Sequence, residues 1–190
     1  MQRSYNMKAR AAMAEATRRR ILQVAAGLLK TRFRSEIRLE NIALGAEVTV
    51  QTVLNVFGSR SVLLDEALTE MLSALRAQRL RPEPGDTTAA IAALVDHYEE
   101  FGDLVIRNLV EQADPELIET GRTGHRNWIR RQFAPHLARF DSKAQRIRVD
   151  ALVCACDVYT WKLLRRDMGR SRGETEATIR ALVSGIVDRD

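Results

Sequence analysis

The chain has 190 residues, only 5% aromatic residues and a formal net charge of +5, so it can form one sizeable core or two smaller ones. Few glycines and prolines and no long β-branched alternation disfavour a sheet and predict an all-α fold. Apolar runs are far shorter than the roughly 18 residues that span a bilayer, and no secretory signal precedes them, so we expect a cytoplasmic protein.

Positive charge is concentrated near the amino terminus. Residues 1–60 hold 11 Lys/Arg and 4 Asp/Glu, a net charge of +7, whereas residues 61–190 hold 19 and 21, a net charge of −2. A local basic surplus is typical of a module that binds a polyanion. A charged face also serves simply to keep a protein soluble, so composition leaves both interpretations open.

Helical periodicity organises the first part of the chain. It predicts a helix at about 15–31, a shorter one at 39–46 and another short one at 50–56. Thr49 is suited to cap the third helix, and Gly58 is suited to the left-handed position that ends it. Ser59 is then expected to cap a fourth helix, whose pattern continues to the linker PEPGDTT.

The short helix at 50–56 is expected to have two different faces. At 100° per residue, Gln51, Thr52 and Asn55 share one side, whereas Val53 and Phe57 lie on the other. One face therefore offers only polar donors and acceptors, and the other face is apolar.

After the linker, periodicity predicts helices at about 87–101, 103–113, 115–137, 143–168 and 174–188. Phe101-Gly102-Asp103 is interpreted as a helix end followed by a new cap, and Pro135 as an end or kink. Ser142 is expected to cap the helix at 143–168.

A long helix followed by two short ones, with a tight turn before the last, is typical of a helix-turn-helix unit. The second short helix of such a unit lies in the DNA major groove. Gln51 and Asn55 suit bidentate bonds to adenine, and Thr52 suits a base, a thymine methyl group or a phosphate. We therefore predict a DNA-binding domain with a basic amino-terminal arm at 1–58, followed by a second helical domain at 59–190, to which the family resemblance described below assigns effector binding and dimerisation.

Arg60 stands where a helix disfavours a cation. A positive charge in the first turn opposes the helix dipole by roughly 0.3 to 1 kcal/mol. A DNA phosphate would reverse this effect, because the free N–H groups and the guanidinium would share one anion. The alternative is a solvated arginine whose stem packs on Phe57.

Groups suited to catalysis are scattered. Cys154 and Cys156 are about 200° apart on a helix and cannot converge on one metal, so we interpret them as buried thiols. The chain's three histidines lack the Glu-x-x-His spacing of helical di-iron sites; they are His97, His125 and His136. We expect no enzyme activity, no cofactor and no metal.

Over about residues 16–68 the chain resembles the tetracycline-repressor (TetR) family of bacterial transcriptional regulators. The resemblance rests on a spaced set of residues: Ile42-Ala43, Ala46, Val48-Thr49, Thr52-Val53, Phe57, Ser59-Arg60 and Leu63-Leu64. It implies that Thr49, Thr52 and Arg60 contact phosphates or bases. The remaining 120 or so residues match the family only in helix layout.

Three residues depart from the family pattern at positions that matter for DNA binding. Glu47 replaces the usual turn glycine, and Leu54 replaces a tyrosine that often contacts phosphate. Arg38 replaces a threonine at a helix start, where it is either a substitute phosphate contact or a surface arginine.

For the carboxy-terminal part, the resemblance implies a homodimer interface and a small-molecule pocket, although both sets of residues also suit an ordinary core. The interface candidates follow two apolar stripes: Leu152, Cys156, Tyr159, Leu163, Ile179, Leu182, Val183 and Ile186. The pocket candidates are mostly aromatic: His97, Phe101, Trp128, Phe133 and Trp161.

We therefore expect a dimeric repressor that an unidentified small-molecule effector releases from a palindromic operator in double-stranded DNA. One alternative is a DNA-binding or adaptor protein without an effector, whose helical body serves only dimerisation or a protein partner. A helical enzyme is a third hypothesis, and it requires titratable residues that face one cavity.

Overall fold

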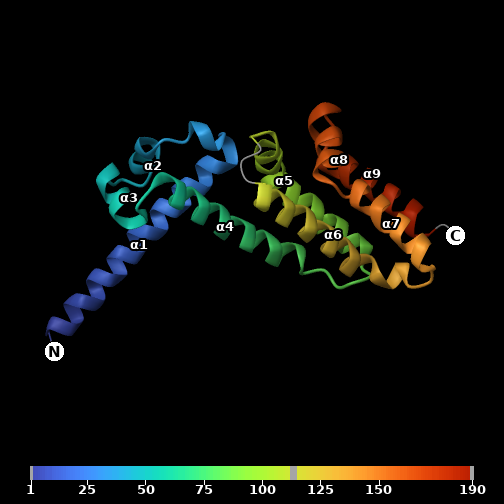
Figure 1. Cartoon of the computed structure of the whole chain (residues 1–190), viewed down its shortest axis with the longest axis horizontal. Helices are drawn as coiled ribbons and strands as arrows, with labels where there is room; N and C mark the ends of the chain where they lie inside the picture. The colour runs from blue at the N-terminus through green and yellow to red at the C-terminus, as the bar shows by residue number, and fades with distance from the viewer. Residues whose placement is uncertain (1, 112–114, 189–190) are drawn as a thin grey trace. The chain divides into compact units, whose positions relative to one another are not determined.

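The computed structural model describes residues 2–111 and 115–188, and every regular element within these ranges is helical (Figure 1). This confirms the predicted all-α class. The chain forms two compact units, Met1–Ala74 and Leu75–Asp190. The boundary predicted at residues 58 and 59 separates functions rather than compact units, and it stays a prediction.

The first unit contains α1 (Gln2–Thr31), the 3₁₀ turn η1 (Arg34–Glu36), α2 (Leu39–Gly45), α3 (Val50–Phe57) and most of α4 (Arg60–Arg79). Apolar residues from all four α-helices form its core, among them Ile21, Ile42, Val53 and Leu63. Helix α2 packs against both α1 and α3. These contacts are the packing expected of a helix-turn-helix unit.

Helix α1 begins well before residue 15, where the sequence pattern had placed its start. Residues 7–16 are all exposed, so this part of the helix contributes no apolar face to the core. Periodicity detects a helix by its buried apolar stripe, and a helical segment that is exposed on all sides leaves no such signal.

The second unit contains α5 (Thr87–Glu111), α6 (Pro115–Leu137), α7 (Ser142–Ala155), α8 (Val158–Lys162), the π-helical turn η2 (Leu163–Asp167) and α9 (Arg172–Val187). Helix α5 packs against α8 and α9, and α7 packs against α6 and α9 (Figure 1). Their apolar stripes meet in one core around Leu94, Phe133, Leu152 and Trp161.

Gly102 does not end a helix, because α5 continues through it to Glu111. The predicted break between 101 and 103 is therefore wrong. A Cβ atom on Gly102 would lie 2.6 Å from Cη2 and 2.8 Å from Cε3 of Trp161. Glycine is thus required here by the close approach of an indole ring, which no local pattern indicates.

The helix predicted at 143–168 is interrupted. Helix α7 ends at Ala155, and the Asp157 carboxylate accepts a hydrogen bond from the Tyr159 N–H at 2.9 Å to cap α8. At the start of α7, Asp141 rather than Ser142 is the cap, accepting from the Ala144 N–H at 2.8 Å. An acidic side chain is a strong cap, so each short segment has its own start signal.

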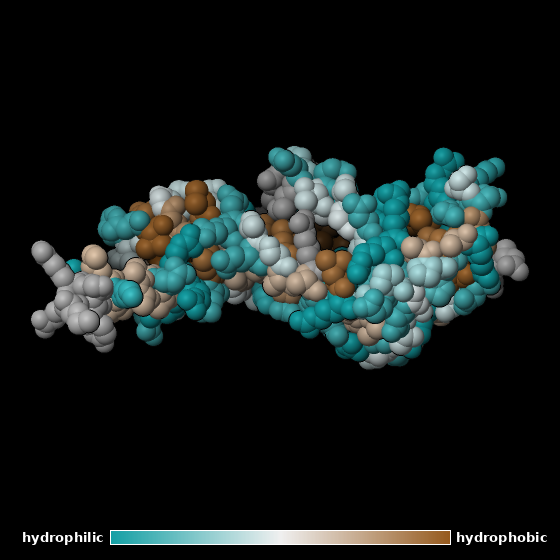
Figure 2. Space-filling model, turned by 90° about the horizontal axis from the view of Figure 1, so that it is seen from below, coloured by the Kyte–Doolittle hydropathy of each residue, from teal (hydrophilic) through white to brown (hydrophobic). Residues whose placement is uncertain are grey.

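Hydrophilic residues cover much of the face seen in Figure 2, with separate apolar areas between them. Among the described residues, none of the helices combines the length and apolarity needed to cross a bilayer.

Candidate functional site

The turn between α2 and α3 places the candidate DNA-reading helix. The Val48 N–H donates to the Ala43 carbonyl at 3.0 Å, and the Arg20 Nε donates to the Ala46 carbonyl at 2.7 Å. Glu47, between them, has φ of 53°. Its side chain is exposed, so the turn keeps a left-handed glutamate where glycine would fit without strain.

Glu47→Gly should therefore stabilise the first unit by about 1 kcal/mol, because glycine adopts this conformation at little cost whereas other residues pay roughly 1 to 2 kcal/mol. The check is the urea midpoint followed by circular dichroism. Glu47→Ala is the matched control, since it removes the same side chain but keeps Cβ. Equal gains from both variants would show that the carboxylate, and not the backbone angle, causes the effect.

Helix α3 begins and ends with the predicted caps. The Thr52 N–H donates to Thr49 Oγ1 at 3.1 Å, and the two threonine hydroxyl oxygens lie 2.9 Å apart. At the other end, Gly58 has φ of 75° and its N–H donates to the Leu54 carbonyl at 2.8 Å. Both short-range signals were therefore correctly interpreted from the sequence.

The two faces of α3 also lie as expected. Val53 and Phe57 are 1% and 6% exposed, whereas Gln51 and Asn55 face solvent and Thr52 is half-buried. Gln51 Nε2 donates to Asn55 Oδ1 at 2.8 Å. The two amides thus stand together on the outer face, one helical turn apart.

Arg60 lies differently from the phosphate contact that the sequence suggested. Its Nε donates to the Ile37 carbonyl and its Nη2 donates to the Arg34 carbonyl. The guanidinium therefore joins the start of α4 to η1 and to Ile37, the residue that follows η1. Of its three nitrogens, Nη1 is the one that makes neither of these bonds.

Other arginines of the basic segment also have structural partners. Arg18 forms an ion pair with Glu66 at 2.5 Å and lies over the Phe57 ring at 4.7 Å, and Arg34 pairs with Asp65 at 2.7 Å. Arg38 is exposed and its side chain does not cap α2. Part of the positive charge therefore holds the first unit together, and part remains available at the surface.

The five pocket candidates are all buried in the second unit, but they form two groups. Phe101 lies 6.2 Å from His97, and Phe133 lies 6.2 Å from Trp128, measured between ring centroids. Trp161 belongs to the His97 group, because the Tyr98 ring lies 5.9 Å from Trp161 and 5.0 Å from His97. Its Nε1 donates to Glu99 Oε1 at 2.9 Å, so the indole is already satisfied.

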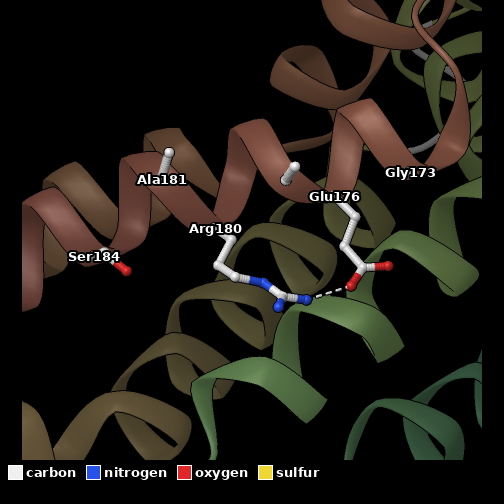
Figure 3. Close-up of a pocket in the computed structure, with 6 residues that line it drawn as sticks. Gly173, Glu176, Arg180, Ala181 and Ser184 are labelled. Atoms are coloured by element: carbon white, nitrogen blue, oxygen red, sulfur yellow. Dashed lines mark hydrogen bonds and ion pairs between the residues drawn. The ribbon is translucent and has the colours of Figure 1, made fainter.

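The two depressions described on the surface of the second unit lie elsewhere. One follows the outer face of α9 and the other follows α6. In the α9 depression, small residues alternate with the Glu176 and Arg180 ion pair (Figure 3). Neither depression is lined by a predicted pocket residue.

The predicted dimer stripes do not lie on one surface. Four of the eight candidates are in the core of their own unit, with exposed fractions of 0 to 1%: Leu152, Cys156, Ile179 and Val183. Three are exposed and apolar, namely Tyr159, Leu163 and Leu182, and Ile186 is half-buried. Of the eight candidates, only the second group has side-chain surface to offer an interface, because the first group already packs in the core of its own unit.

The two cysteines also differ from each other. Cys156 is buried, and burial raises the pKa of its thiol to about 12. Cys154 is exposed, contrary to the expectation of two buried thiols. Within the described residues, no group of three or more His, Cys, Asp or Glu side chains is placed to hold a metal ion.

This arrangement of helices matches a solved structure. The crystal structure of a tetR-family transcriptional regulator from Streptomyces coelicolor aligns with 93% of this chain and 84% of that chain, with a TM-score of 0.69 and 19% sequence identity. The chain has a TetR-like fold. No protein-family model matches the chain, and comparison with curated proteins gave no match.

The TetR-like fold extends the sequence resemblance from residues 16–68 to most of the chain. It accounts for the helix-turn-helix unit and for the helical second unit as parts of one architecture. At this level of identity the likeness concerns the fold alone, so function has to be argued from the residues.

Proposed function

We propose that this protein is a sequence-specific DNA-binding transcriptional regulator. The observation that carries the proposal is the outer face of α3, where Gln51 and Asn55 are exposed and paired at 2.8 Å. The face stands on a short helix, capped at both ends, in a TetR-like fold. A helix of this kind enters the major groove with its polar side chains toward the base edges.

The amide pair has chemistry suited to adenine. Once Gln51 Nε2 has donated to Asn55 Oδ1, the Gln51 oxygen remains as an acceptor and the Asn55 nitrogen as a donor. Adenine presents a donor at N6 and an acceptor at N7 in the major groove. The two side chains together therefore complement one adenine edge.

Phosphate contacts would come from the residues around this helix. Thr49 and Thr52 offer hydroxyl groups at its start, and Arg38 offers an exposed guanidinium at the start of α2. Arg60 would add a contact through Nη1 or the second hydrogen of Nη2, because Nε and the first hydrogen of Nη2 bind carbonyl groups. Such contacts fix register, and the amides supply the sequence preference.

We infer a homodimer because one short helix contacts few base pairs, and two-fold symmetry that places two such helices about 34 Å apart is the usual solution. Tyr159, Leu163, Leu182 and Ile186 supply an apolar surface for it. The small residues of the α9 depression would let a partner helix approach closely.

The dimer would act as a repressor, released from a palindromic operator when an effector favours a different spacing of the two α3 helices.

One observation favours a second candidate, a DNA-binding protein without an effector. Phe133 and Trp161 are fully buried in close packing, and neither surface depression reaches them. In this case the second unit would serve dimerisation alone.

The test is selection of bound sequences from a random DNA pool with the full chain, followed by affinity measurements on the recovered sequence. Gln51→Ala should reduce discrimination between the best sequence and single-base variants by about 1 to 3 kcal/mol. Gln23→Ala, an exposed glutamine on α1, is the matched control and should change nothing. For a dimer with about three phosphate contacts per protomer, log affinity should fall with log salt concentration at a slope of about −5.

A recovered sequence that is not palindromic would contradict the dimer. Equal effects of Gln51→Ala and Gln23→Ala would contradict the role of α3. If the chain binds no DNA at low ionic strength, the proposed function itself fails.

A further inference from the structure

Arg79, the last residue of α4, is a cation whose guanidinium contacts two uncharged rings. Its Nη2 lies 2.9 Å from His125 Nδ1, and its guanidinium carbon lies 4.3 Å from the centroid of the Trp128 ring. Its Nε is buried and has no hydrogen-bond partner. The ion pairs of the described residues do not include Arg79. Burial lowers the pKa of Arg79, and the charge of the Asp157 carboxylate opposes this effect only in part.

The two histidines near Arg79 do not balance its charge. His125 accepts from Arg79 at Nδ1 and faces the Val153 carbonyl with Nε2 at 3.4 Å, which fits the neutral ring with its proton on Nε2. Burial lowers the pKa of His125 to about 4, and the positive charge of Arg79 is the second cause of this shift. His97 is 6% exposed with a pKa lowered to about 3 by the same causes, and its Nδ1 is also buried without a partner.

A buried cation with an unpaired N–H is costly unless an anion completes it. Charge-assisted hydrogen bonds to a carboxylate are among the strongest that arginine makes. The Trp128 ring beside Arg79 and the Tyr98 and Phe101 rings beside His97 suit the apolar body of such an acid.

We propose that Arg79 binds the carboxylate of a small organic acid with an apolar body, and that the unpartnered Nδ1 of His97 supplies a second polar contact. Neither surface depression described above is lined by Arg79, His97 or His125. The inference names a ligand class for the effector of the proposed function. It rests on the proposed function only for one consequence, that ligand binding changes the affinity for DNA. That consequence follows because α4 begins next to the Gly58 turn and ends at Arg79.

The experiment is isothermal titration of the full chain, without DNA, using sodium benzoate at constant ionic strength. Benzamide, which has the same ring but no charge, is the matched ligand control. Benzoate should bind saturably with one site per chain, and benzamide should bind at least tenfold more weakly. Arg79→Met should weaken benzoate at least tenfold, whereas Arg146→Met, at an exposed arginine of α7, should leave it unchanged.

Because Arg79→Met removes the arginine from the stack on Trp128, its fold is checked by circular dichroism. If that variant does not fold, the comparison of benzoate with benzamide on the unmodified chain decides the question. Three outcomes would overturn the proposal. They are equal binding of benzoate and benzamide, no binding of benzoate or of sodium hexanoate, and unchanged benzoate binding by folded Arg79→Met.

A final measurement separates this proposal from the proposed function. Benzoate is added to the protein bound to its selected DNA sequence, and DNA affinity is measured again. Benzoate binding with unchanged DNA affinity would support the Arg79 site and contradict the effector mechanism. If the chain binds DNA but binds neither acid, the proposed DNA-binding function is supported and the Arg79 site is contradicted.

Discussion

Replacing Gly102 with alanine is expected to lower the free energy of unfolding of the second unit by about 2 kcal/mol. The new methyl group would lie 2.6 Å from Cη2 of Trp161, well inside contact distance. The indole cannot move aside cheaply, because it is fully buried and its Nε1 is bonded to Glu99. Extra atoms in a closed core typically cost about 1 to 3 kcal/mol.

The sign of this result is informative because alanine normally stabilises a helix relative to glycine by about 1 kcal/mol. Gly124→Ala, in α6, is the matched control: its Cβ would have nothing within 4 Å, so that variant should gain stability. Both are measured by urea denaturation at one protein concentration. If Gly102→Ala is as stable as Gly124→Ala, the close packing of α5 on Trp161 is not present in solution.

Arg60→Met is expected to destabilise the first unit by about 2 kcal/mol. The substitution keeps an apolar stem but removes the donors to the Ile37 and Arg34 carbonyls. Hydrogen bonds that involve a charged group contribute about 1.5 to 3 kcal/mol each when buried, and this guanidinium is only part-buried. Losing them separates the start of α4 from the segment before α2.

Arg38→Met is the control for charge, since Arg38 is exposed and should change stability by less than about 0.5 kcal/mol. Thermal denaturation of both variants distinguishes the two roles of Arg60. A folded Arg60→Met protein of unchanged stability that loses DNA affinity would restore the phosphate contact suggested by the sequence. A loss of stability with DNA affinity retained by the folded fraction would support the structural role.

The cluster of Arg79, His97 and His125 illustrates a limit of sequence interpretation. In the sequence, His97 lies near an apolar stripe and is a pocket candidate, whereas Arg79 carries no such signal. Its importance depends on the Trp128 ring and the His125 imidazole, which are 46 or more residues away in the chain. A site made by such distant residues becomes visible only when the helices are packed.

By itself, the sequence determined the all-α class, the three-helix pattern of the first unit, the caps of α3 and the division of that helix into a polar and an apolar face. These features depend on residues within one or two helical turns of each other, where propensity, capping and periodicity act directly. The tertiary structure alone decided that Gly102 makes room for Trp161, that Arg60 binds carbonyl groups, and which half of the apolar stripes is core. Each of these depends on contacts between segments more than 20 residues apart, and local patterns do not encode which segments will meet.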